Sequence, residues 1–362
     1  MSKKSTILAL SAIGVVIIGS YVSLSFHNRN TQTDIITIGA PLSLTGSAAT
    51  DGLNIKRGID LAVDVLSKQG IYVNVVYEDD GTEAKRTVSA VQKIISTNKP
   101  EAIIGPTWGI LVDSIKNIVD DARVVSYSPA NTSEFVNSKG DYLFFGATIN
   151  ARKEGPLAEW LKQNNKKKVA IIIDKSTWGE SNALAFEKAV KDSGGDVVYR
   201  EEIPFGAEAS TLPTSLAKLN SVGADVILAT GYEEGLTLLI NKVKQLDSKI
   251  PVVIASQIPK TLLARGVIHL DDQYEVDIVT TKASEEFASK FYAKYGEAPG
   301  TYADRAYDGL MLLVEAIRNK SKKETLKDYL HNKTNYAGYA TTYKFDENGD
   351  VVGGDWVIEK LK

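Results

Sequence analysis

The sequence contains no cysteine among its 362 residues. This absence excludes disulfide bonds, thiolate nucleophiles, cysteine-rich zinc or iron–sulfur sites and a lipid anchor on cysteine. Histidine is almost as scarce: His27, His269 and His331 are the three present, and none lies in an H-E-x-x-H motif or beside a motif serine. A P-loop and a G-x-G-x-x-G sequence after a strand are also missing. We therefore predict a protein that is not an enzyme, with no catalytic residue, no metal site and no cofactor.

A strong charge of either sign is lacking as well. Lys and Arg number 42 against 45 Asp and Glu, which gives a net charge of −3. Basic residues are dispersed except for the run Lys166, Lys167 and Lys168. No stripe of aromatic residues accompanies this run, so it is typical of a solvated helix end. We expect no nucleic-acid partner.

The N-terminus is the one long stretch without charge. Lys3 and Lys4 precede residues 5–26, and the most apolar part, residues 7–18, has the length of a signal-peptide core. At about 1.5 Å per residue the whole stretch would also span ~30 Å of hydrocarbon. No Ala-x-Ala site follows, so a cleaved signal and a retained anchor both stay open. The remainder is expected outside the cytoplasmic membrane, in a periplasm or on the outer face.

From Ile35 onward, β-type apolar runs alternate with amphipathic helical stretches, as in parallel βαβ units. A chain of this length favours two domains, and the pattern divides into two doubly wound halves. A final hairpin is expected around the Asn348–Gly349 turn. The expected strands are residues 35–40, 72–77, 102–105, 124–127, 169–173, 197–201, 226–229, 252–255 and 275–279. The expected helices open at Asp51 and cover residues 83–96, 109–120, 180–193, 210–222, 235–245, 284–295, 302–319 and 324–332, with a possible helix at 260–264.

Small polar residues and aromatics follow several of these strands. In open α/β sheets, ligands bind beyond the carboxyl ends of the strands, so the loop at 127–133 is a candidate site. The loop at 105–109 enters a helix whose free N–H groups suit an anion. Trp178, Tyr232 and Gln257 stand at equivalent points in the second half. Together these loops predict a walled ligand pocket.

The sequence also resembles a known family, through residues spread over nearly all of the chain after Ile35. The markers are residues 41–46 with Gly52 and Gly58, 104–106, 128–130, 178–179, 291–292, 295–296, Pro299, 306–309 and 345–350. In this order they resemble the type I periplasmic solute-binding proteins, in the leucine/isoleucine/valine-binding-like branch that serves ABC importers.

The resemblance implies two Rossmann-like lobes joined by three crossovers, near Thr148, Thr280 and Ala340. Residues 1–34 would then be the signal or anchor plus a linker. Lobe 1 would comprise residues 35–147 and 281–339, and lobe 2 residues 148–280 and 340–362. The implied function is capture of a small organic ligand between hinged lobes, by a monomer that delivers it to an ABC permease in the membrane. An extracellular sensor with the same fold and an extracellular hydrolase are the alternatives.

The resemblance also implies roles for residues. In amino-acid-binding relatives, the loop matching Ala130, Asn131 and Thr132 holds the ligand carboxylate together with a serine, which Gly109 replaces here. The acidic residue that meets the ligand ammonium is replaced by Gln257.

A neutral amide cannot balance a buried ammonium, so two readings follow. In the first, Asp51 supplies the missing negative charge, although Asp51 could instead be only the N-cap of its helix. In the second, the ligand has no α-ammonium. In the latter case Trp108, Trp178 and Tyr232 would clasp an aromatic acid, an amide or a quaternary amine. We predict a ligand with a carboxylate or amide end.

Overall fold

The computed structural model describes residues 35–132, 135–136, 138–203, 214–246, 248–255, 273–278, 282–354 and 356–361. Residues Ile35–Lys362 form one compact unit. Gln257, the possible helix at 260–264 and the crossover predicted near Thr280 lie outside the described residues.

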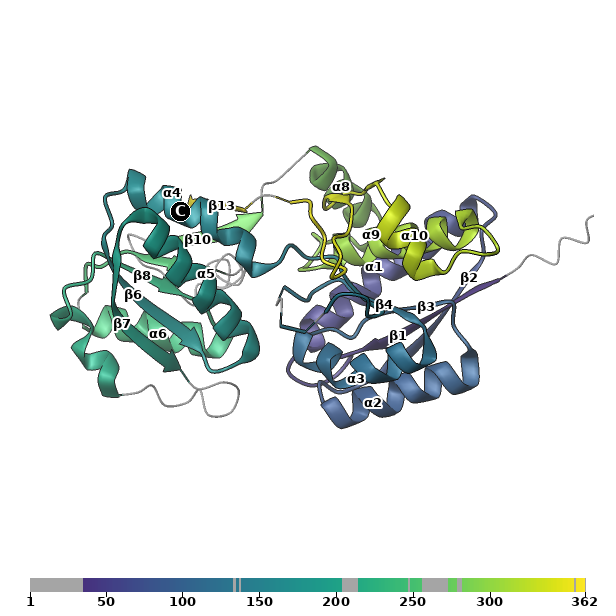
Figure 1. Cartoon of the computed structure of the whole chain (residues 1–362), viewed down its shortest axis with the longest axis horizontal. Coiled ribbons are helices and arrows are strands. Elements are labelled where there is room, and N and C mark those ends of the chain that lie inside the picture. Colours follow the sequence, from purple (N-terminus) through teal and green to yellow (C-terminus); the bar gives the residue numbers. More distant parts are fainter. Residues whose placement is uncertain are drawn as a thin grey trace, which may run out of the picture. The chain divides into compact units, whose positions relative to one another are not determined.

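The first sheet is parallel and five-stranded, in the order β2-β1-β3-β4-β5. Its strands are β1 (Ile36–Leu42), β2 (Val73–Asp79), β3 (Ala102–Ile104), β4 (Val125–Ser128) and β5 (Leu143–Phe145). Helices α2 (Ala84–Lys93) and α3 (Gly109–Ala122) cover one face and α1 (Ala49–Lys68) the other (Figure 1). Because both faces are covered, β1 reads as a nearly continuous apolar run rather than an alternating one.

The helices near the C-terminus complete this first lobe. They are α8 (Lys282–Tyr295), α9 (Ala303–Asn319) and α10 (Leu326–Lys333). Helix α9 packs along α1, whose buried face carries Ile55, Ile59 and Leu66 at helical spacing. A Cβ at Gly58 would lie 2.1 Å from the carbonyl oxygen of Ala303, so glycine is required for this close approach.

The second sheet has six strands in the order β13-β10-β9-β8-β6-β7. They are β6 (Lys168–Asp174), β7 (Asp196–Ile203), β8 (Val226–Ala229), β9 (Val252–Ile254), β10 (Gln273–Ile278) and β13 (Trp356–Lys360). Helices α4 (Glu154–Gln163) and α5 (Thr177–Ser193) share one apolar core with the sheet, and α6 (Glu233–Gln245) shares a second core on its other face. The prediction of two doubly wound α/β lobes is confirmed.

Several local predictions were wrong or missing. Strand β5 and helix α4 were not predicted, because β5 has three residues and α4 follows it after a short 3₁₀ turn, η2 (Asn150–Lys153). The expected helix at 210–222 is a 3₁₀ helix, η4 (Thr214–Ser221), in its described part. Helix α2 continues as a π-helix, η1 (Ile94–Asn98).

The final hairpin is only partly as predicted. A turn with Gly349 at φ +83° joins Phe345 and Val351 in an antiparallel bridge, preceded by the short pair β11 (Tyr336–Ala337) and β12 (Thr342–Tyr343). The last strand, β13, instead pairs antiparallel with β10 of the second sheet. Phe345 and Val351 belong to the apolar core that also holds residues of β1, α1 and α9, and the crossovers and lobe bounds given above stay predictions.

Among the described helices, none is both long and apolar enough to cross a membrane. The apolar stretch at residues 5–26, for which a signal or anchor was predicted, lies outside the described residues.

Candidate ligand-binding site

A pocket of about 690 Å³ lies where the strand-to-helix loops of the two lobes meet. Its size suits a small organic molecule, and its position follows the rule that open α/β sheets bind ligands beyond the carboxyl ends of their strands. Eight of the nine candidate residues line it, namely Asp51, Trp108, Gly109, Ala130, Asn131, Thr132, Trp178 and Tyr232. The ninth, Gln257, lies outside the described residues. The role of these side chains as ligand contacts stays a prediction.

Asp51 is not the cap of its helix. Helix α1 begins at Ala49 with Ala48 as N-cap, which puts Asp51 in the first turn and makes the capping interpretation wrong. Its Oδ2 accepts a hydrogen bond of 2.9 Å from Nε1 of Trp108. Burial raises the pKa of the Asp51 carboxyl, and this hydrogen bond opposes the rise. The Asp51 carboxyl therefore already has a hydrogen-bond donor within the protein.

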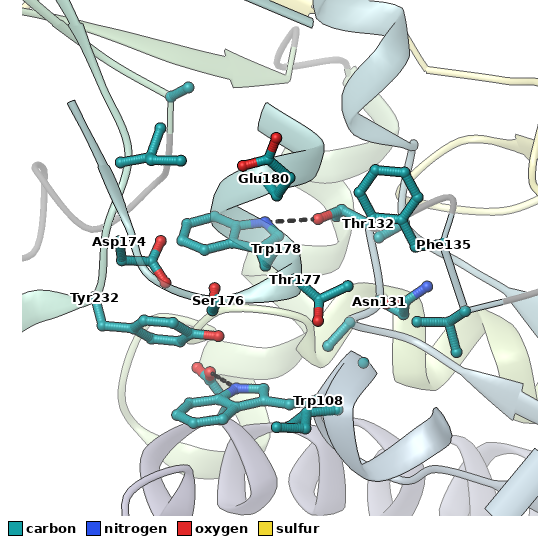
Figure 2. A pocket seen from close by; sticks show the side chains of 18 of the residues that line it. Trp108, Asn131, Thr132, Phe135, Asp174, Ser176, Thr177, Trp178, Glu180 and Tyr232 are labelled. Atoms are coloured by element: carbon teal, nitrogen blue, oxygen red, sulfur yellow. Dashed lines mark hydrogen bonds between the residues drawn. The ribbon is translucent and has the colours of Figure 1, made fainter. Parts of the chain in front are cut away.

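Three aromatic rings form a continuous surface, which we call the aromatic wall: Trp108, Tyr232 and Trp178. The ring centroids of Trp108 and Tyr232 are 4.9 Å apart at 46°, and those of Trp178 and Tyr232 are 5.2 Å apart at 56°. Figure 2 shows the three rings along one side of the pocket. Trp108 precedes α3 of the first lobe, whereas Tyr232 and Trp178 follow strands of the second. The wall thus joins the two lobes.

A second cross-lobe contact fixes the polar side of the pocket. Nε1 of Trp178 donates a 2.9 Å hydrogen bond to Oγ1 of Thr132, as Figure 2 shows. Trp178 is held at the start of α5, where the Ser176 hydroxyl accepts a hydrogen bond from the Gly179 N–H and caps the helix. The carbonyl of Thr132 accepts from the Asn150 N–H at 2.8 Å. The side chain and the backbone carbonyl of Thr132 thus both hold the loop after β4 in place, through Trp178 and Asn150.

Helix α3 starts at Gly109 in the pocket lining, and its first N–H groups to donate within the helix are those of Leu111 and Val112, both to the carbonyl of Trp108, so the two before them, of Gly109 and Ile110, are directed out of the helix start. Trp108 is the N-cap of α3 and gives no side-chain hydrogen bond to the first turn. The first N–H groups of a helix have no intrahelical partner, and they attract anions. This geometry suits a carboxylate at the entrance of α3.

Asn131 leaves no room for a larger side chain at position 109, where the resemblance implied a serine in relatives. A Cβ on Gly109 would lie 2.3 Å from Oδ1 of Asn131, whose side chain is buried. The Asn131 side chain therefore fills the space that a serine at position 109 would need.

Asp174, which was not among the predicted site residues, is the last residue of β6 and lines the pocket. Its side chain is 2% exposed, and within the described structure neither carboxylate oxygen has a hydrogen-bond partner. Burial raises its pKa to about 6, although the nearby Ser176 hydroxyl opposes the rise. An acidic residue directly after a strand of Ile and Val was the available signal.

Two basic side chains of the pocket were missed as well. Arg305, in the first turn of α9, is 6% exposed and its guanidinium lies 5.6 Å from the ring of Tyr302. Lys153 is buried too, but its Nζ donates to Oδ1 of Asn150, Oδ1 of Asn182 and the carbonyl of Ala255. Lys153 is thus occupied in holding the second lobe together. Nothing in the printed sequence pattern places Arg305 near the strand-end loops, because α9 lies far along the chain.

The part of the chain that the structure describes contains no cluster of three His, Asp or Glu side chains arranged to hold a metal ion.

Comparison with known proteins identifies the family. The model of the periplasmic binding protein family matches residues 35–361. The chain belongs to this family, in the type I class of two-lobed ABC transporter substrate-binding proteins. Because these are binding proteins, the predictions of a solute-binding role and of a non-enzyme are confirmed.

Curated relatives support the same branch. The chain is 23% identical to the leucine-, isoleucine-, valine-, threonine-, and alanine-binding protein of Pseudomonas aeruginosa, over 92% of the chain and 91% of the relative. It is 31% identical to Leu/Ile/Val-binding protein homolog 3 of Brucella melitensis, over 54% of each protein, so that match spans about half of this relative.

Solved structures share the fold. The branched-chain amino acid substrate-binding protein LivJ of Streptococcus pneumoniae, in complex with isoleucine, superposes with a TM-score of 0.77 at 22% identity, over 90% of this chain and all of that one. A solute-binding protein of Rhodopseudomonas palustris in complex with 3,4-dihydroxybenzoic acid gives a TM-score of 0.75 at 19% identity, over 91% and 93%.

Proposed function

We propose that this protein captures a small organic carboxylate, with amino acids the leading class, and presents it to an ABC permease outside the cytoplasmic membrane. The observation that carries the proposal is the pocket, which joins an anion-suited helix start at Gly109 to an aromatic wall. Relatives named for branched-chain amino acids and a neighbour that holds a dihydroxybenzoic acid support a carboxylate ligand.

The carboxylate would lie between the start of α3 and the loop after β4. The N–H of Gly109 and the N–H and hydroxyl groups of residues 130–132 are the proposed donors. Thr132 accepts a hydrogen bond from Trp178, so its own O–H proton is available to donate to a ligand oxygen. Arg305 adds a positive charge to the same pocket. These donors favour an anionic end of the ligand.

Capture would proceed by closure of the lobes. The segment around Thr148 and the one around Gly353 lie side by side, since Oγ1 of Thr148 donates to the carbonyl of Gly353 at 3.1 Å. We propose that these two segments form part of the hinge between the lobes. A ligand can favour the closed form only by its differential affinity, and about 5.5 kcal/mol moves a 1:99 equilibrium to 99:1. The permease would then read the closed form.

The N-terminal residues would target the protein to the membrane. We propose that residues 1–34 act as a secretion signal or a retained anchor, and that the binding lobes work as a monomer in the periplasm or at the outer membrane face. The mass of the mature protein, measured separately in the membrane fraction and in the supernatant, tests this. A mass that lacks the N-terminal residues indicates a cleaved signal, and the full mass in the membrane fraction indicates a retained anchor.

A thermal-shift screen tests the function. The purified protein would be melted with the proteinogenic amino acids, aromatic acids, simple amides and choline. A ligand present at 100 times its Kd should add about 2.7 kcal/mol to the free energy of unfolding. Every hit should be recovered chemically unchanged. If no carboxylate in the panel shifts the melt, or if hits are turned over, the proposed function is wrong.

A further inference from the structure

The pocket is lined by a basic side chain, Arg305, that the protein leaves unpaired. Its hydrogen bonds within the described residues are made by its backbone: the N–H donates to Oδ1 of Asp304, and the carbonyl accepts from the Tyr127 hydroxyl. The residue is 6% exposed, yet none of the guanidinium nitrogens is among the fully shielded polar atoms that lack a partner in the described structure. Arg305 is therefore a cation that a molecule in the pocket can reach.

The surroundings of Arg305 do not explain it as a stabilising residue. A buried charge without a partner is costly. Arg305 also lies in the first turn of α9, where the positive end of the helix dipole disfavours a cation. Its guanidinium lies over the ring of Tyr302, 5.6 Å from the ring centre, which positions the group and leaves its hydrogen-bond donors unused. The donors await an acceptor from outside the protein.

Arg305 reaches the pocket from the side opposite to the proposed carboxylate donors. Helix α9 packs along α1 on one face of the first sheet, and α3, which begins at Gly109, covers the other face (Figure 1). A row of side chains connects the two sides. Trp108 at the start of α3 donates to Asp51 of α1. Burial raises the pKa of the Tyr302 phenol, the charge of Asp51 adds to the rise, and that of Arg305 opposes it. The two groups of donors therefore suit two separate anionic groups.

We propose that Arg305 binds a second anionic group of the ligand, at the far end from the carboxylate held at the start of α3. This inference rests on the proposed function and narrows its ligand class to compounds with two carboxylates, such as acidic amino acids and small dicarboxylic acids. A guanidinium presents a planar fork of donors that matches a carboxylate. The cavity of about 690 Å³ has room for a ligand of this kind. Arg305 then selects against ligands with an uncharged side chain.

Matched ligands isolate the second anionic group. The full-length protein is titrated in a calorimeter with L-aspartate against L-asparagine, L-glutamate against L-glutamine, and benzene-1,4-dicarboxylate against 4-carbamoylbenzoate. Each pair exchanges one carboxylate for an amide of nearly the same shape. Wild type should bind the dicarboxylate of the pair that fits at least about tenfold more tightly, because a hydrogen bond between two charged groups is stronger than one to a neutral amide. L-Leucine should bind more weakly than this dicarboxylate.

Two variants of Arg305 and one control complete the test. Arg305→Met keeps a long side chain without charge and should weaken the dicarboxylate by at least about 30-fold, because it removes one partner of a buried charge pair, while the amide keeps its affinity. Arg305→Lys keeps the charge but loses the fork, so its loss should be intermediate. Arg57→Met removes an arginine of α1 that is 42% exposed and pairs with Glu297, and it should change neither titration.

The remaining outcomes overturn the assignment. Equal losses for both members of a pair in Arg305→Met would mean that Arg305 supports the fold or the shared carboxylate. Should Arg305→Met not fold, the wild-type preference and the partial loss in Arg305→Lys decide. If wild type binds the amide as tightly as the dicarboxylate in every pair, or binds L-leucine more tightly than all three dicarboxylates, the inference fails and the proposed function stands. If none of these compounds and no other carboxylate in the screen binds, the proposed function fails and this inference with it.

Discussion

Asp174→Asn should raise the free energy of unfolding of the protein at neutral pH. The pKa of Asp174 is about 6 in the folded protein, against 3.8 for an unperturbed aspartate. Below the lower value the carboxyl is neutral in both states and burial has no electrostatic cost. Above the higher value it is charged in both states, and the folded protein bears the full cost, about 3 kcal/mol from the shift of the pKa. This contribution therefore lowers stability as the pH rises from about 4 to about 6.

Urea denaturation at pH 4, 5, 6 and 7.5, without ligand, measures this effect. The free energy of unfolding of Asp174→Asn minus that of wild type should grow with pH and level off near pH 6 to 7. Buried Asp308, whose pKa is raised to about 7 by burial, changes both proteins alike and cancels in the difference. A difference that does not vary with pH, or a variant less stable than wild type at pH 7.5, would refute the assignment of Asp174 as an unpaired buried charge.

Two other changes follow from the site geometry. Gly109→Ser places a Cβ 2.3 Å from Oδ1 of Asn131 and should cost about 1–3 kcal/mol of stability by overpacking. The double variant Gly109→Ser with Asn131→Ala should recover most of this loss. An unchanged melting temperature of Gly109→Ser alone would contradict the prediction. Trp108→Phe keeps a ring but leaves the buried Asp51 carboxyl without its indole donor, so in urea it should cost about 1–3 kcal/mol. The matched Trp178→Phe removes a donor to the neutral Thr132 hydroxyl and should cost only about 0.5–1.5 kcal/mol, and the reverse order would count against the account.

Most of the fold follows from sequence periodicity. The strands at β6 and β8 are short, apolar and β-branched, and they are predicted to within a residue or two. Helix α1 shows its buried stripe at the expected spacing. Strand β5 was missed because a three-residue strand carries no period. The partner of β13 was also missed, since pairing with β10 depends on the tertiary path of the chain and not on the turn before it.

The site was predictable where it follows strand ends. Trp108, Thr132 and Trp178 line the pocket because the carboxyl ends of parallel strands meet at one edge of each sheet. Arg305 was out of reach, since it comes from α9, far along the chain. Asp174 was missed for another reason: its importance lies in the partner it lacks, and a sequence does not show which carboxylates go unpaired.

Occlusion of the pocket tests the central claim most directly. Thr177 is exposed, lines the pocket and lies between its two sides in Figure 2, so Thr177→Trp would fill the space with little cost to folding. Titration of the strongest ligand from the screen should give one site per wild-type molecule and no measurable binding to Thr177→Trp, although both proteins melt cooperatively at similar temperatures. Undiminished binding to the filled pocket would contradict the account.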